Sequence, residues 1–504
     1  MVFLCSVFNF VAALRIRKKI YDDDSLPIVA IINDVGVLQL RKNQYQIAKT
    51  CFTEALRFWK LKLDDYYDYH SEALMNLAEI DHLSGDYDDA ISRLTEALHL
   101  MKTKVGERHT SVGLIYYKLG LSFKAKEEYI DGLDALERSL TIRSDIYGQS
   151  SSQVAEVLKC IGTLCLAMGE LAKARNYLGE SLKIMNIVSP NNFETADILY
   201  SLGKVMSKMR YLEEAQTYFQ QALEIRSVQS DDAVNADIIS DLGAILEEKQ
   251  QYKESLNMYE KTLKIRISLY GEDSSIGDSY HMIGNIHQTM NEYEPALSNF
   301  GSALVVYQNT VGDDHLSCAK TMNNIAIVYE ATNDLDEALK YHREALRIRK
   351  KNLGRDHLKV ANSLDNIAGV YQKQNNVDKA CSALKEALRI RIAKLGNDHL
   401  EVGTTLFGMG ILYCDKGDLL RAMDCYEASL KIRKRRVGPS SIEVAQTIFN
   451  IGSLHAMKQD YNNALNSWRN ALEIYRITLP DDHHMVACAI GNIQMAENVL
   501  SGGA

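Results

Sequence analysis

The sequence predicts an all-α solenoid, a right-handed superhelix of stacked antiparallel helix pairs. Three columns of small residues recur along the 504-residue chain at steps of 40 to 42 residues, and they shift together even where a step is short. Within each step, apolar residues sit three and four apart in two successive stretches, which is helical spacing. Such a fixed period is typical of repeat architectures. The first column reads Gly36, Ala78, Gly120, Gly162, Gly203, Gly243, Gly284, Ala326, Ala368, Gly410 and Gly452.

The unit around Ala326 shows the two helices of one repeat. Ile325 and Val328 have helical spacing in the first helix, and Leu335 and Leu339 have it in the second. Thr332, Asn333 and Asp334 separate the two stretches with residues typical of turns. We call the first helix of each repeat the A helix and the second the B helix.

The small columns indicate how the helices pack. A Gly inside a helix costs about 1 kcal/mol relative to Ala, so a recurrent Gly needs a packing reason. The second column runs from Ala48 to Ala464, and a large residue follows four positions later, as Phe52 follows Ala48. We expect the marker glycines to touch these large side chains, so that a Leu at position 410 would overpack the contact.

The repeat period sets the expected boundaries. Residues 1–22 should form a half-repeat consisting of a B helix alone, residues 23–483 eleven tandem helix pairs, and residues 484–504 a capping helix with a short tail. The apolar start of the chain also resembles a signal peptide. However, Ser6 and Phe10 fall one step before Ala48 and Phe52, which favours the B helix. Shortened steps around 182–296 indicate a change of superhelical twist or a weak boundary.

The ends of the B helices carry recurrent polar residues. Arginines late in these helices should complement the partial negative charge of the helix end. Glycines such as Gly354 follow as C-terminal caps. Asp314, Asp356 and Asp398 are the predicted N-caps of the A helices that come next.

Composition excludes several classes of function. The net charge of −9 argues against a generic nucleic-acid binder. The nine cysteines form no CxxC motif, which indicates reduced thiols in a cytoplasmic protein. No stretch approaches the roughly 20 apolar residues of a membrane span, so we expect no membrane partner.

The most catalytic-looking feature is an Asp-His pair that recurs once per repeat, as at Asp314-His315 and Asp356-His357. Packed helices lie ~8–10 Å apart, whereas metal ligation needs ~2 Å, so these histidines should mark helix starts. No phosphate loop, HExxH or GxSxG motif occurs. We therefore expect no enzyme, no cofactor, no metal and no small-molecule substrate.

Two basic features also have structural interpretations. The run from Lys431 to Arg436 resembles a nuclear-import signal but lies at a B-helix end, where a solvated basic turn is expected. A carboxylate clamp needs Lys, Asn and Arg on three adjacent A helices. Candidates such as Lys159, Lys204 and Asn285 are scattered, which disfavours a clamp.

Small and aromatic columns on paired helices resemble the tetratricopeptide repeat. The 42-residue step, with "LGNDHLEV" and "ALRIRKKNLGRDHLKVANSLDNIAGVYQKQNNVDKA", is similar to the longer repeat of kinesin light chains and nephrocystin-3. In kinesin light chains, A-helix asparagines just before the marker line the concave groove and hold extended cargo peptides. An amide suits this task because it donates and accepts hydrogen bonds together. The corresponding groove residues are Asn76, Asn323, Asn324, Asn366 and Asn450, and Asn285 and Asn362 should face the same surface.

The resemblance implies a non-enzymatic cytoplasmic adaptor that binds an extended peptide or partner helix in its concave groove. Asp365, Phe407-Gly408 and Phe449 depart from the asparagine pattern of the family. A solvated polar face is the alternative reading of the asparagines. The alternative function is an oligomerisation or regulatory segment of a larger nephrocystin-3-like protein with a nucleotide-binding domain. The half-repeat around Ser6–Lys19 would favour this alternative, with self-association through it.

Overall fold

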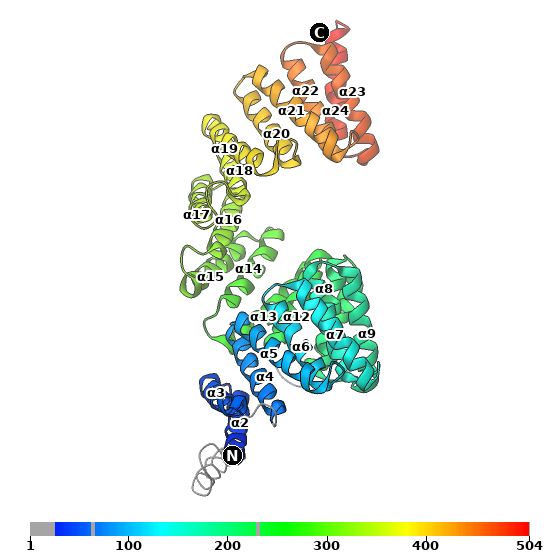
Figure 1. Ribbon diagram of the computed structural model, residues 1–504. Helices are drawn as coiled ribbons and strands as arrows, with labels where there is room; N and C mark the ends of the chain where they lie inside the picture. The colour runs from blue at the N-terminus through cyan, green and yellow to red at the C-terminus, as the bar shows by residue number, and fades with distance from the viewer. Residues whose placement is uncertain (1–25, 62–65, 228–231, 503–504) are drawn as a thin grey trace. The chain divides into compact units, whose positions relative to one another are not determined.

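A computed structural model describes residues 26–61, 66–227 and 232–502, and every regular element in these ranges is an α-helix (Figure 1). The predicted all-α solenoid is confirmed. The predicted half-repeat at 1–22 lies outside the described residues. The chain divides into two compact units, residues 1–251 and residues 252–504, and this division falls within the stretch of shortened steps.

Unit one consists of helix pairs in chain order and ends with an A helix. Each A helix except this last one packs against the B helix that follows it, and each B helix packs against the next A helix. The A helices are α2 (Leu26–Arg41), α4 (Tyr67–Ser84), α6 (Thr110–Ala125), α8 (Ser152–Met168), α10 (Phe193–Lys208) and α12 (Ala233–Glu248). The B helices are α3 (Tyr45–Leu61), α5 (Tyr87–Val105), α7 (Tyr129–Tyr147), α9 (Leu171–Val188) and α11 (Leu212–Ser227).

Unit two begins with a B helix, continues with five A–B pairs and closes with a last A helix. The same nearest-neighbour packing holds throughout it. The A helices are α14 (Ser274–Thr289), α16 (Leu316–Ala331), α18 (Leu358–Lys373), α20 (Leu400–Asp415), α22 (Ile442–Met457) and α24 (His484–Leu500). The B helices are α13 (Tyr252–Tyr270), α15 (Tyr293–Val311), α17 (Leu335–Leu353), α19 (Val377–Leu395), α21 (Leu419–Val437) and α23 (Tyr461–Thr478).

The marker glycines are points of close approach between paired helices, as expected. A Cβ atom on Gly410 would lie 2.5 Å from Cε1 of Tyr426 on the following B helix, and Tyr426 is buried. No side chain fits there without moving the ring, which explains why Gly is kept despite its cost in a helix. The pairs that make this contact are Gly36 with Phe52, Gly120 with Leu136, Gly162 with Leu178, Gly203 with Phe219, Gly284 with Phe300, Gly410 with Tyr426 and Gly452 with Trp468.

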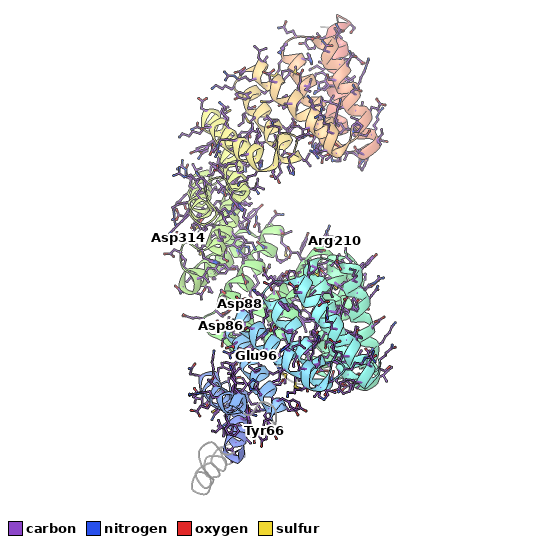
Figure 2. The ribbon with its side chains drawn as sticks, in the orientation of Figure 1. Tyr66, Asp86, Asp88, Glu96, Arg210 and Asp314 are labelled. Carbon is purple, nitrogen blue, oxygen red and sulfur yellow. The ribbon has the colours of Figure 1, made fainter. Side chains whose placement is uncertain are left out.

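The predicted N-caps at Asp314, Asp356 and Asp398 are wrong. The histidine that follows each Asp is the cap, and its Nδ1 accepts from the amide two residues later. The N–H of Ser317 thus donates to Nδ1 of His315 at 3.2 Å. Asp314, labelled in Figure 2, instead accepts from Arg347 and Lys351 of the B helix α17. The aspartates therefore tie the start of each A helix to the B helix that follows it, while the histidines satisfy the orphan amides.

The late B-helix arginines do more than complement a helix end. Arg143 is buried, and its Nη1 donates to the carbonyl of Gln153 at 3.2 Å and to Glu156 at 2.8 Å, both on the next A helix. Arg226 is also buried and pairs with Asp197 and Asp232 at 2.8 Å. These arginines therefore join one repeat to the next, which the sequence did not indicate.

Candidate partner-binding surface

Polar side chains connect neighbouring A helices of unit two on one face. α14 also contacts α16 directly. Nδ1 of His281 on α14 lies 3.1 Å from Oγ1 of Thr321 on α16. Nζ of Lys373 on α18 donates to Oε2 of Glu330 on α16 at 2.9 Å. We call this surface the A-helix face of unit two.

Four of the predicted asparagines pair across this face. Nδ2 of Asn324 donates to Oδ1 of Asn285 at 2.8 Å, and Nδ2 of Asn366 donates to Oδ1 of Asn323 at 2.8 Å. All four side chains are half-buried. Within the described residues, Oδ1 of Asn324, Oδ1 of Asn366, Nδ2 of Asn323 and Nδ2 of Asn285 have no hydrogen-bond partner. The pairs therefore hold the amides in place and leave two acceptors and two donors for a bound chain.

A buried histidine fixes the position of Asn324. Burial, with Lys320 nearby, lowers the pKa of His281 from 6.5 to about 4, so its ring is neutral at physiological pH. The Thr321 hydroxyl donates to the carbonyl of Ser317, and its oxygen can accept from His281 Nδ1–H. Nε2 of His281 is then an acceptor, 3.4 Å from Nδ2 of Asn324.

The other three predicted asparagines have different surroundings. Asn362 is exposed on α18, and its Oδ1 accepts from Nη2 of Arg391 at 2.8 Å. Asn450 is half-buried on α22 beside aromatic side chains. Asn76 belongs to unit one, where its Nδ2 is buried without a hydrogen-bond partner. The structure brings Asn362 together with the paired amides, because it lines the same hollow as Asn323 and Asn366.

This hollow has a volume of about 500 Å³ and lies over α16 and α18, with one side chain from α17. Three of its lining side chains are cations, Lys320, Arg349 and Lys359. We call it the cationic hollow. The remaining lining residues are Leu316, Ser317, Asn323, Asn362 and Asn366.

A second hollow of about 330 Å³ lies over α20, α22 and α24, with Tyr475 from α23. Phe407, Phe449 and Met485 give it an apolar lining, and Asn450 and Gln446 add amides. Phe407 and Phe449 are the positions at which the sequence departs from the asparagine pattern. The surface is therefore polar and cationic over α16 and α18 and becomes aromatic over α20, α22 and α24.

The sequence did not identify the three cations as a group. The arginines late in the B helices, Arg349 among them, were expected only to complement the charge of their own helix ends, and the two lysines had no assigned role. Comparison of positions 42 residues apart would have revealed them, since Lys320 and Lys359 stand where the next repeat has Asn362 and Glu401.

No group of three or more potential metal ligands occurs within the part of the chain that the structure describes. The recurrent histidines are helix caps, as argued above. Of the basic run on α21, Arg433 is buried and Arg436 donates to Asp398, so these two charges serve the fold. None of the helices in the described ranges has the length and apolar character that a membrane crossing requires.

Comparison with known families and structures gives a consistent result. The tetratricopeptide repeat family matches residues 28–103, 69–145, 111–187, 153–227, 235–308, 296–351 and 359–435, and a second model of this repeat matches 444–484. Comparison with curated proteins gives no match.

Two solved structures of low identity with TM-scores above 0.5 have the same kind of fold, and a third matches a smaller part of the chain. The apo form of RapI is 14% identical, with a TM-score of 0.54 over 73% of this chain and 99% of that one. A STAND protein with a tetratricopeptide repeat sensor, PH0952 from Pyrococcus horikoshii, is 16% identical, with a TM-score of 0.52 over 71% of this chain and 53% of that one. A putative kinesin light chain repeat protein from Podosopora anserina is 17% identical, with a TM-score of 0.38 over 41% of this chain and 99% of that one.

The family matches cover most of the sequence, and the helix pairs, marker contacts and repeat period agree with them. The chain belongs to the tetratricopeptide repeat family.

Proposed function

We propose that the chain is a non-enzymatic adaptor that holds an extended peptide or partner helix on the A-helix face of unit two. Tetratricopeptide repeats indicate a protein–protein interaction scaffold. The finer proposal rests on one observation, the paired asparagines Asn285–Asn324 and Asn323–Asn366. Each pair fixes its amides before a partner arrives, which lowers the ordering cost of binding.

The atoms left open suit a peptide backbone. An extended segment presents N–H and C=O groups alternately, and Oδ1 of Asn324 and Asn366 can accept while Nδ2 of Asn323 can donate. Asparagine is a mediocre helix former, so its place on consecutive A helices needs a reason other than helix stability. Backbone recognition supplies that reason, and the neighbouring hollows would select side chains. A cytoplasmic location remains a prediction.

The test replaces two of these amides. The double variant Asn324→Ala/Asn366→Ala and the wild-type chain are each immobilised, and captured proteins are identified by mass spectrometry and then titrated individually. The control variant Asn462→Ala/Asn470→Ala changes two exposed asparagines on the B helix α23. We expect a partner whose affinity falls in the first variant alone, with unchanged helical circular dichroism. Equal affinity for all three proteins would contradict the assignment of the surface.

A further inference from the structure

Two arginines at the same position of consecutive repeats have different surroundings. Arg391 on α19 pairs with Asp365 of its own A helix and, at 3.1 Å, with Glu401 of the next A helix. Arg349 on α17, one 42-residue step earlier, donates to Oγ of Ser363. Neither a salt bridge nor a carboxylate hydrogen bond to Arg349 is present among the described residues. Arg349 is therefore a half-buried cation whose charge the fold leaves unneutralised.

The difference comes from three substitutions between the two repeats. Asn323 stands where the next repeat has Asp365, and Lys359 stands where it has Glu401. Lys320 replaces Asn362. The two carboxylates that would neutralise the arginine have thus become an amide and a cation, and a further cation has been added.

This arrangement costs stability in the free protein. Burial lowers the pKa of Arg349, with no opposing contribution from a neighbouring acid. Desolvating a charge without a partner is unfavourable. Arg143 and Arg226, at the corresponding place in unit one, each have carboxylate partners. Arg433, one step after Arg391, donates to the carbonyl of Glu443 and to Thr447, and the nearby Glu443 carboxylate opposes the lowering of its pKa by burial. The missing anion at Arg349 is consistent with one that a ligand supplies.

The cationic hollow is built to receive such an anion. Arg349, Lys320 and Lys359 all line its volume of about 500 Å³, and its lining contains no carboxylate. Lys320 and Lys359 form no ion pair with any described residue. Nδ2 of Asn323, which is open, and the Ser317 hydroxyl add neutral donors to the three charged ones.

We propose that the cationic hollow binds a phosphorylated side chain of the partner peptide. The inference rests on the proposed function, since it places the peptide on the same face. A phosphorylated Ser or Thr carries a charge of about −1.5 to −2 and three acceptor oxygens. Three cations are enough to neutralise that charge, their donors with those of the amide and the hydroxyl can reach all three oxygens, and a guanidinium binds two of the oxygens together. A side-chain carboxylate brings a single charge and two oxygens, and leaves more of the hollow unneutralised.

The experiment uses the full-length chain and three fluorescein-labelled libraries of degenerate nine-residue peptides. The central residue is phosphoserine, serine or glutamate. Fluorescence anisotropy gives the affinity for each library, and inorganic phosphate serves as a competitor. We expect the phosphoserine library to bind on the order of tenfold more tightly than either of the others. Inorganic phosphate should displace it only at far higher concentration.

A repeat swap tests the assignment of the site. The triple variant Lys320→Asn/Asn323→Asp/Lys359→Glu gives Arg349 the two carboxylates and the amide that surround Arg391, so the next repeat already shows that this composition folds. The variant should lose the preference for phosphoserine and keep or raise its melting temperature. The control Lys385→Glu/Lys431→Glu makes the same change in formal charge at exposed positions on α19 and α21, and should retain the preference.

Several results would overturn the proposal. These are equal binding of the phosphoserine and serine libraries, equal binding of the glutamate library, and inorganic phosphate that binds as tightly as the peptides. A preference that survives the repeat swap, or that the control variant also loses, would overturn it too. If the libraries bind equally but binding requires Asn324 and Asn366, the proposed function is supported and the phosphate site is refuted. If neither libraries nor captured partners depend on Asn324 and Asn366, the proposed function itself fails.

Discussion

The close contact at Gly410 makes the packing of the repeats directly testable. In the variant Gly410→Ala, the added methyl would lie 2.5 and 2.6 Å from Cε1 and Cδ1 of Tyr426. These distances are too short for any carbon–carbon contact, and the ring is buried. Either the tyrosine moves or α20 and α21 separate.

Two opposing effects set the magnitude. A Gly to Ala change in a helix stabilises it by about 1 kcal/mol when there is room for the methyl. Overpacking a tight core costs about 1–3 kcal/mol. Gly301 lies within α15, and a Cβ there would meet nothing within 4 Å. Gly301→Ala is therefore a matched control that should show only the helix stabilisation, without the cost of overpacking.

Native-state hydrogen exchange of the full-length chain suits this comparison because repeat arrays open locally. Peptides from α20 and α21 report on Gly410→Ala, and peptides from α15 report on the control. We expect the change in opening free energy to be less favourable by about 1–3 kcal/mol for Gly410→Ala than for Gly301→Ala. This corresponds to roughly a fivefold to hundredfold difference in exchange.

A second substitution separates the contact from other causes. Ala368 is the marker of the preceding repeat and packs in one buried cluster with Leu384, the counterpart of Tyr426. Gly410→Ala/Tyr426→Leu reproduces that pair and should recover most of the loss. Equal protection of Gly410→Ala and Gly301→Ala, or no recovery in the double variant, would refute the packing role of the marker column.

Three further predictions concern the polar contacts. The pKa of His281 is about 4 in the folded chain and near 6.5 when unfolded, so its contribution to stability is full above pH 6.5 and is lost as the pH falls toward 4. Urea unfolding at pH 7 and pH 4.5 should therefore show a smaller pH dependence of stability in His281→Gln than in the wild type. An equal pH dependence in the two proteins would contradict this. His357→Ala removes the N-cap of α18 and should cost about 0.5–2 kcal/mol in the opening free energy of its first turn by hydrogen exchange, whereas unchanged protection would exclude the capping role. Arg391→Met leaves Asp365 without its cation and should cost about 3–5 kcal/mol in thermal unfolding; Arg391→Met/Asp365→Leu should regain most of it, and failure to do so would show that the ion pair is not the cause.

The sequence predicted the fold in detail because the repeat displays the same interaction many times. A single Gly within a helix is ambiguous, but Gly410 and its counterparts 40 to 42 residues apart can be explained only by a shared contact. The final helix, His484–Leu500, begins at the first residue of the range expected for the capping helix.

Side-chain direction was harder to predict, because it depends on the neighbouring repeat. An Asp before a helix is a common N-cap, yet the Asp314 carboxylate accepts from Arg347 and Lys351 instead, and His315 caps the helix. The sequence placed the asparagines on one face of the A helices, but it did not indicate which of them form hydrogen bonds with each other. The cationic hollow was missed because Arg349 was assessed on its own helix, without the α16 and α18 residues that surround it.

Site-specific photo-crosslinking tests most directly whether the A-helix face of unit two contacts the partner. A benzoylphenylalanine is placed at position 362, which is exposed on the A helix α18 and lines the cationic hollow, or at position 385, which is exposed on the B helix α19. We expect the captured partner to crosslink from position 362 and not from position 385. Crosslinking from position 385 alone, or equally from both positions, would contradict the proposed binding surface.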